Sequence, residues 1–93
     1  MMSDFKKGDV VSVVTLSGEY MGKYNQNHAD GGLTLDDPRM LIAGDDGIGF
    51  ARGICMTGVE NVNTVRFKDY VYFTPTNAEF EKAYRTAVSG IIL

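Results

Sequence analysis

Short runs of apolar and β-branched residues, separated by glycine-containing or polar breaks, predict β-strands over the first part of the chain. Val10 to Leu16 is a β-branched run that stops at Ser17-Gly18, a two-residue turn. The chain returns from Glu19 to Asn25, and Gly22 lies in the middle of this segment, where a small barrel has to bend. A polar loop over Asn25–Gly32 follows. The pattern therefore predicts a tight hairpin whose second strand is bent.

Further strands are predicted on both sides of a turn in the middle of the chain. Leu33-Thr34-Leu35 is the third strand, and Arg39–Ala43 is apolar enough to continue it past a kink at Pro38. Gly44-Asp45-Asp46-Gly47 is a turn. From Ile48 to Gly58 large side chains alternate with small ones, which predicts a strand whose small side lies close to another backbone.

The last third of the chain combines one more strand with a helix. Val65–Thr74 is dense in strand-forming residues and is interrupted by polar Lys68-Asp69. Thr76 and Glu79 then have the spacing of a capping box, with Thr76 at the N-cap position. One helical stripe follows and comprises Phe80, Ala83, Tyr84, Ala87 and Val88.

The last residues of the chain predict where this helix ends, and they include an apolar segment after it. Glu81 and Arg85 are placed to pair on the outer face of the helix, and Gly90 is a suitable C′ residue. Ile91-Ile92-Leu93 would form an exposed apolar patch if it were left in water. We expect this tail to fold over the barrel or to pack on a neighbouring subunit. Because the first strand is apolar on both faces, an oligomer is favoured.

Composition and charge argue against several classes of function. The chain has 93 residues and 44% apolar residues, which predicts one globular domain over residues 1–93. No apolar run approaches the roughly 20 residues that span a bilayer, and the N-terminal segment lacks the apolar stretch of a secretory signal. With a single cysteine, the expectation is a cytoplasmic protein without a membrane partner. A net charge of −3 and an isoelectric point near 4.9 argue against double-stranded DNA and favour a local binding site.

No pattern in the chain indicates an enzyme, a metal site or a cofactor. His28 is the only histidine, so a His/Cys metal set or a histidine-based triad cannot form within one chain. A lone loop histidine is most often a solvated polar residue, and otherwise it can stack on a base. Asp36-Asp37 and Asp45-Asp46 are interpreted as structural turn residues. Cys55, on the small face of its predicted strand, is interpreted as a buried packing residue.

The order of the first three predicted strands resembles the first signature motif of Sm and LSm proteins. The matching positions are hydrophobics in the first strand, a glycine in the turn, a glycine in the second strand and an L-x-L third strand: Val11, Val13, Gly18, Gly22, Leu33 and Leu35. Three residues separate Gly18 from Gly22, whereas the family usually has four. The family's acidic and asparagine positions fall on Ala29 and Gly32, and the loop offers Asn25, Asn27, His28 and Asp30 close by.

The second family motif, a hydrophobic residue followed by Arg-Gly, has two candidates. Phe50-Ala51-Arg52-Gly53 keeps the Arg-Gly pair, while Val65-Arg66-Phe67 keeps the arginine and lies directly before a predicted final strand. The sequence leaves both open. The GDVVSVVT opening and the FARG and FTPTN segments are most similar to Sm-like proteins of bacteriophages of the cyanophage type, and the resemblance covers about residues 8–75.

The resemblance implies a fold and a function. The expected fold is mainly β, a small, strongly bent, five-stranded Sm-like (SH3-like) barrel over about residues 8–75 with one C-terminal α-helix over about residues 77–89. The expected assembly is a homo-oligomeric ring of five to seven subunits that binds single-stranded RNA at its pore, in host cytoplasm if the protein is phage-encoded. The RNA-binding residues would be Tyr24, Asn25, Asn27, His28, Asp30, Arg52, Gly53 and Arg66.

A rival hypothesis from another functional class is a structural or protein-interaction ring that binds no nucleic acid. The acidic isoelectric point and the missing asparagine of the first motif favour this alternative. A base-stacking role is also open for Tyr24, the tyrosine nearest the polar loop.

Overall fold

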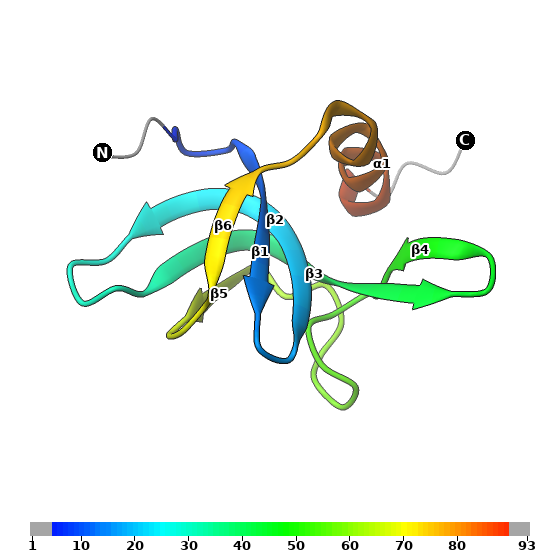
Figure 1. Cartoon of the computed structure of the whole chain (residues 1–93), viewed down its shortest axis with the longest axis horizontal. Helices are drawn as coiled ribbons and strands as arrows, with labels where there is room; N and C mark the ends of the chain where they lie inside the picture. The colour runs from blue at the N-terminus through cyan, green and yellow to red at the C-terminus, as the bar shows by residue number, and fades with distance from the viewer. Residues whose placement is uncertain (1–4, 90–93) are drawn as a thin grey trace.

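The computed structural model describes residues 5–89 and consists of an antiparallel sheet of six strands followed by one helix (Figure 1). The elements are β1 (Val10–Thr15), β2 (Gly18–Asn27), β3 (Leu33–Gly44), β4 (Gly47–Phe50), β5 (Thr64–Phe67), β6 (Tyr72–Pro75) and α1 (Ala78–Ser89). The predicted mainly β class with one C-terminal helix is confirmed.

The sheet is bent but is not closed into a barrel. Its strand order is β4-β3-β2-β1-β6, and β5 pairs with the first half of β3 while β4 pairs with the second half. No ladder joins β5 to β6 in the described chain. The prediction of a strongly bent five-stranded barrel is therefore wrong in strand number, and the sheet does not close into a barrel. The extra strand arises because β3 is 12 residues long and its far half forms a separate hairpin with β4.

The strand β3 continues through Pro38, as predicted, by means of a bulge. Lys23 faces Asp36 and Met21 faces Arg39, so β3 carries one more residue than β2 over this interval. Asp37 adopts a φ of 49° at this point. Proline has no N–H group for a ladder, and a bulge is a position within a sheet where it is tolerated. The bulge turns backbone carbonyl groups of β3 toward the helix, where Tyr84 binds them.

Gly22, predicted to lie where the sheet bends, is opposite this bulge and in close contact with β3. A Cβ atom at Gly22 would lie 3.0 Å from Leu35 Cβ and 3.2 Å from the Asp36 carbonyl oxygen. The two strands thus approach each other more closely than a Cβ atom ordinarily allows, at the point where the sheet bends.

Gly22→Ala is expected to lower the free energy of unfolding by about 1–3 kcal/mol because the methyl group overpacks this contact. Gly49→Ala is the matched control, since a Cβ atom at Gly49 on β4 meets nothing within 4 Å. The control should change stability by no more than about 0.5 kcal/mol. Urea unfolding followed by circular dichroism measures both, and equal effects of the two variants would contradict the close approach.

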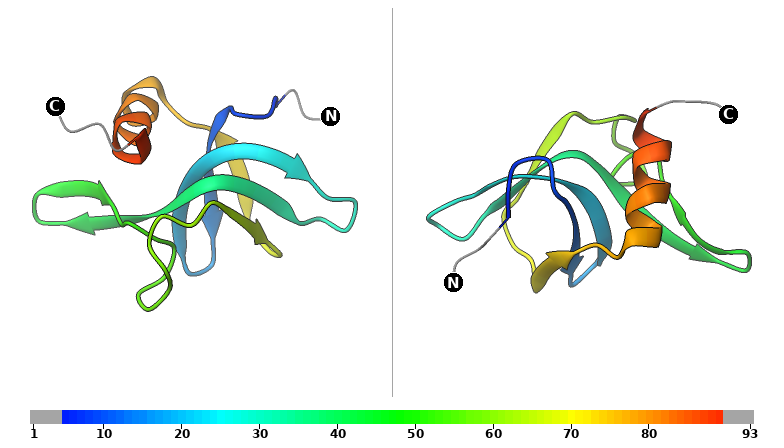
Figure 2. Two further views of the ribbon diagram at one scale, coloured as in Figure 1. Left: turned by 180° about the vertical axis from the view of Figure 1, so that it is seen from behind. Right: turned by 90° about the horizontal axis from the view of Figure 1, so that it is seen from above.

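The bent sheet has an apolar cluster on each face. The inner cluster consists of buried residues on β1 and β3, namely Val11, Val13, Leu33 and Leu35. The outer cluster joins Val10 and Met21 to Tyr84 of α1, with Leu41 and Phe50 packed against them. The two views of Figure 2 show α1 on one side of the sheet, close to the base of the β3–β4 hairpin. Successive residues of β1 therefore serve different clusters, as the strand period requires.

The helix begins one residue later than predicted and has a different cap. The Asn77 side chain, not that of Thr76, accepts the first-turn hydrogen bond, from the Phe80 N–H group at 2.9 Å. The Thr76 hydroxyl is instead paired with Ser12 Oγ of β1 at 2.8 Å, so the predicted cap residue binds the sheet and not the helix. The pair between Arg85 and Glu81 is confirmed at 3.1 Å. The predictions for Gly90 and for Ile91-Ile92-Leu93 fall outside the described residues.

The alternating segment from Ile48 to Gly58 is a strand only as far as Phe50, so this prediction is wrong for its second half. Residues 51–63 form an irregular segment, in which the chain folds back so closely that a Cβ atom at Gly53 would lie 3.0 Å from the Val59 carbonyl oxygen. Cys55 is exposed rather than buried, because no neighbouring strand pairs with it. The predicted break in the final strand is confirmed, since residues 68–71 separate β5 from β6.

Candidate nucleic-acid interface

The loop between β2 and β3 is held in one conformation by its own backbone. The N–H group of His28 donates to the Gly32 carbonyl at 2.8 Å, and the N–H group of Gly31 donates to the His28 carbonyl at 2.9 Å. The Gly32 N–H group donates to Asp30 Oδ1 at 3.1 Å. Gly31 has a φ of 98°, a conformation for which glycine is suited. The loop is thus stabilised by hydrogen bonds among its own residues.

An ion pair connects this loop to β5. Arg66 Nη2 donates to Asp30 Oδ2. A Cβ atom at Gly32 would lie 2.8 Å from Arg66 Nε, so the absence of a side chain at Gly32 makes room for the guanidinium group. The Gly32 N–H group, and next the Arg66 side chain, lower the pKa of Asp30 below its ordinary value. Asp30 therefore carries its negative charge at neutral pH, and Arg66 has an internal counter-ion.

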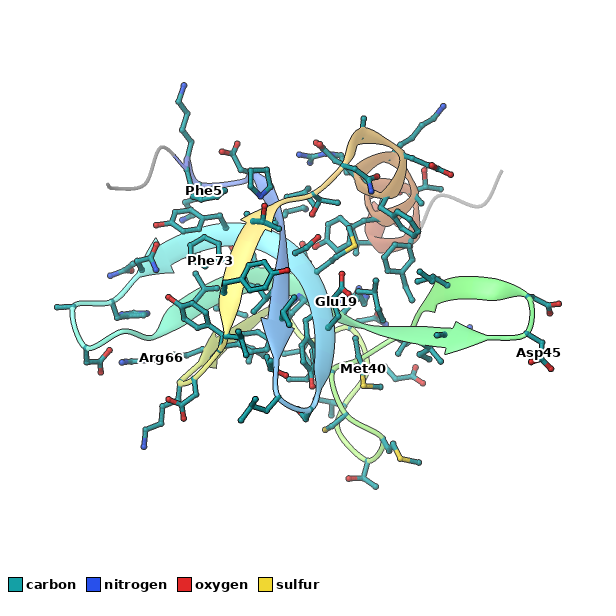
Figure 3. The ribbon with its side chains drawn as sticks, viewed as in Figure 1. Phe5, Glu19, Met40, Asp45, Arg66 and Phe73 are labelled. Atoms are coloured by element: carbon teal, nitrogen blue, oxygen red, sulfur yellow. The ribbon has the colours of Figure 1, made fainter. Side chains whose placement is uncertain are left out.

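The position of Arg66 shows which of the two predicted arginines lies beside the loop. In Figure 3, Arg66 lies beside the β2–β3 loop, whereas Met40 lies well away from it across the sheet. Gly53 accepts a hydrogen bond from the Met40 N–H group at 2.9 Å, and Arg52 accepts one from the Asn61 N–H group at 2.7 Å. Arg52-Gly53 thus belongs to the irregular 51–63 segment. The structure does not bring this pair together with the loop residues.

His28 is more constrained than a solvated loop histidine. Its Nε2 atom is hydrogen-bonded to Thr34 Oγ1 at 2.6 Å, and its ring is half-buried. Thr34 is itself buried at 9% exposure. Sequence reasoning missed Thr34, although its position between the inward-facing Leu33 and Leu35 assigns it to the opposite face of β3, where it meets His28. The bond orients the imidazole ring at the base of the loop.

Asn27 is positioned by two tyrosines. Tyr24 Oη donates to Asn27 Oδ1 at 2.8 Å and accepts from the Asn27 N–H group at 3.1 Å, while Asn27 Nδ2 reaches Tyr70 Oη at 3.5 Å. Asn27 is exposed and ends β2, so it lies in the strand rather than in the predicted loop. These hydrogen bonds fix the orientation of the Asn27 amide at the edge of the loop.

Tyr24 and Asn25 have structural roles. The Tyr24 ring stacks on Phe5 at a centroid distance of 5.6 Å and on Phe73 at 6.2 Å, so its stacking partners are protein rings (Phe5 and Phe73 are labelled in Figure 3). Asn25 lies within β2 and donates to both carboxylate oxygens of Asp36 at 3.1 Å. Of the eight residues suggested by the sequence, the structure thus gathers Asn27, His28, Asp30 and Arg66 around the loop.

Other kinds of site find no support in the described part of the chain. Residues 5–89 contain no group of three or more histidine, cysteine, aspartate or glutamate side chains that could hold a metal ion. Within the same range, no helix has the length and apolar character needed to cross a membrane. Comparisons with protein-family models, with curated proteins and with solved structures gave no match.

Proposed function

We propose that this protein is an Sm-like subunit that forms a homo-oligomeric ring and binds short single-stranded RNA at the ring pore. The ion pair between Asp30 and Arg66 is the observation that carries this proposal. It joins the two segments that resemble the first and the second Sm motif, although they are 36 residues apart in the chain. Their meeting favours Arg66 over Arg52 as the counterpart of the motif arginine.

The chemistry around the loop suits a nucleotide. The Asn27 amide and the His28 ring offer hydrogen-bonding groups and a flat surface, which are used to bind unpaired bases. Arg66 is 48% exposed, so its guanidinium group can contact a phosphate while Asp30 still holds it in place. One subunit would engage one nucleotide through these groups. Repetition around a ring raises the effective concentration of each weak contact for the same strand.

The open edges of the sheet support assembly. β5 pairs only with β3, and β6 pairs only with β1, so each has one edge without a ladder in the described chain. Leu16 is 99% exposed, and Val71 and Tyr72 near the β6 edge are more than half exposed. Unpaired edges bordered by apolar side chains favour pairing with another chain. We infer that β5 of one copy pairs with β6 of the next, a head-to-tail contact that closes into a ring.

The bend of the sheet agrees with a barrel-like subunit. β5 and β6 pair with strands β3 and β1, which are separated by β2, yet only residues 68–71 connect β5 to β6. The sheet must therefore curve far enough to bring its two sides within reach of a short connection. An Sm-like fold in which the β3–β4 hairpin is an added feature is consistent with this arrangement.

Native mass spectrometry of the protein, alone and with short oligo(U) or oligo(A), tests the proposal. We expect one closed ring of five to seven copies that takes up one oligonucleotide per ring. A monomer at micromolar concentration would contradict the assembly. A ring that ignores both oligonucleotides would contradict RNA binding and would favour the structural or protein-interaction module.

A further inference from the structure

Arg39 is a buried cation for which the described chain provides no counter-ion. Its exposed fraction is 5%, and none of the four ion pairs found among residues 5–89 includes it. Arginine does not lose its proton in proteins, so this positive charge cannot be removed by titration. A buried charge without a partner is unfavourable, which indicates that an anion completes the site.

The Arg39 guanidinium group retains hydrogen-bonding capacity. Nη1 donates to the Pro38 carbonyl at 2.9 Å and Nη2 donates to Asn61 Oδ1 at 3.1 Å, which accounts for two of the five N–H groups. Nε makes no hydrogen bond within the described chain. Because no fully enclosed side-chain nitrogen in that part of the chain lacks a partner, Nε is not completely enclosed. The group therefore has donors available for a ligand.

These donors border a pocket of about 290 Å³ on the side of the sheet occupied by α1 and the 51–63 segment. Its lining combines two arginines and an amide with apolar side chains and contains no carboxylate: Arg39, Arg52, Asn61, Phe50, Ala51 and Ala87. In a protein with a net charge of −3, two cations in one pocket are a local exception. The pocket is separate from the Asp30–Arg66 pair. In Figure 3, Arg66 lies well away from Met40, and Met40 is the chain neighbour of Arg39.

Arg52 is positioned to assist Arg39. The Asn61 N–H group binds the Arg52 carbonyl at 2.7 Å while the Asn61 side chain accepts from Arg39, so Asn61 links the two arginines. Arg52 is 79% exposed, and its contact with Glu60 spans 3.8 Å between two exposed side chains. Such a pair is weak, so the Arg52 side chain can turn to a stronger anion.

We propose that the Arg39–Arg52 pocket binds a phosphate group. Two guanidinium groups match a doubly charged oxyanion, and their forked N–H groups fit phosphate oxygens in a bidentate manner. Free phosphate and the phosphate of a nucleotide share this chemistry. Phe50 offers an apolar wall to the base of a nucleotide. This site does not depend on RNA binding at the β2–β3 loop.

Nuclear magnetic resonance of the ¹⁵N-labelled protein tests the proposal at constant ionic strength in a phosphate-free buffer. Titration with inorganic phosphate should produce saturable shifts of the Arg39 Nε–H and Asn61 backbone signals. Uridine 5′-monophosphate should bind more tightly than phosphate if the natural ligand is a nucleotide and equally if it is free phosphate. Uridine, which lacks the phosphate, should leave the Arg39 signal unchanged.

Four exposed positions provide variants that avoid disturbing the buried Arg39. Arg52→Gln should weaken phosphate binding about tenfold, and Glu60→Gln should strengthen it about two- to fivefold because Arg52 loses its competing partner. Lys82→Gln, on the outer side of α1, removes one positive charge and should change nothing. Arg66→Gln should weaken RNA binding at least tenfold per engaged subunit without altering the Arg39 titration, which separates the two sites. A linear, non-saturating shift, or equal effects of Arg52→Gln and Lys82→Gln, would overturn the proposal.

Discussion

Tyr84→Ala is expected to lower the free energy of unfolding by about 3–5 kcal/mol. Tyr84 is completely buried between α1 and the sheet, where it packs with Val10 and Met21. Its hydroxyl group donates to the Asp37 carbonyl at 2.6 Å, a carbonyl that the bulge in β3 has turned away from the ladder. The alanine variant leaves a cavity and an unsatisfied acceptor. For a domain of this size, that loss is a large part of a total stability of about 5–15 kcal/mol.

Tyr84→Phe separates the two contributions. It keeps the ring and removes only the hydroxyl group, so a smaller loss of about 1–2 kcal/mol is expected. Urea unfolding at neutral pH, followed by far-ultraviolet circular dichroism, measures both variants. A loss below about 1 kcal/mol for Tyr84→Ala would contradict the packing of α1 on the sheet.

Stability should also depend on alkaline pH through the same side chain. Burial, and secondly the Asp37 carboxylate, raise the pKa of Tyr84 well above its ordinary value of 10.0. In the unfolded chain Tyr84 ionises near pH 10, while in the folded chain it stays neutral. The folded state then binds the additional proton, so its advantage is full below pH 10 and declines as the pH rises further. Tyr84→Phe should remove this part of the alkaline decline.

Arg66→Gln is expected to weaken binding of oligo(U) or oligo(A) by at least tenfold per engaged subunit, on the order of 1.5–3 kcal/mol. The variant removes the exposed β5 cation that lies beside the loop, together with its bond to Asp30. Lys68→Gln, two residues further along and exposed, is the matched control because it removes the same charge outside the site. Fluorescence anisotropy of a labelled oligonucleotide compares the two variants, and equal losses would show that general charge, rather than the Arg66 site, holds RNA.

The salt dependence of RNA binding offers a second readout of the same site. Each unpaired cation that contacts a single strand contributes a slope of about −0.7 in a plot of log K against log salt. Asp30 already serves as the counter-ion of Arg66, so fewer ions are released on binding. We therefore expect a slope shallower than about −0.7 per engaged subunit for the native protein. A steeper slope would contradict a local site on an acidic surface.

Where sequence patterns and structure agree, the interactions are local or steric. The tight first hairpin, the interruption at Lys68-Asp69 and the Glu81–Arg85 pair involve residues that are close in the chain. The hairpin turn lies at Leu16-Ser17, one residue earlier than the predicted Ser17-Gly18, because Gly18 pairs with Thr15. Gly22 was predicted to lie where the sheet bends, and it lies opposite the bulge in β3, in close contact with Leu35. Such signals depend little on the rest of the molecule.

Where sequence patterns and structure differ, the local structure depends on which distant segment of the chain becomes the neighbour. Thr76 has the spacing of an N-cap, yet its hydroxyl group pairs with Ser12, 64 residues away, and Asn77 caps the helix instead. Cys55 alternates as a buried strand residue would, but no strand lies beside it and it is exposed. Period and composition cannot reveal which segment of the chain becomes the neighbour.

By itself, the sequence determined the strand-rich class, the tight first hairpin, the bend at Gly22 and the existence of a C-terminal helix, because these depend on residue period, turn chemistry and backbone sterics. Only the tertiary structure decided that the sheet stays open and that β3 serves two partners. It also decided that Arg66 rather than Arg52 meets the β2–β3 loop, while Arg39 and Arg52 share a separate pocket. These outcomes depend on pairing between segments far apart in the chain, for which local patterns carry no information.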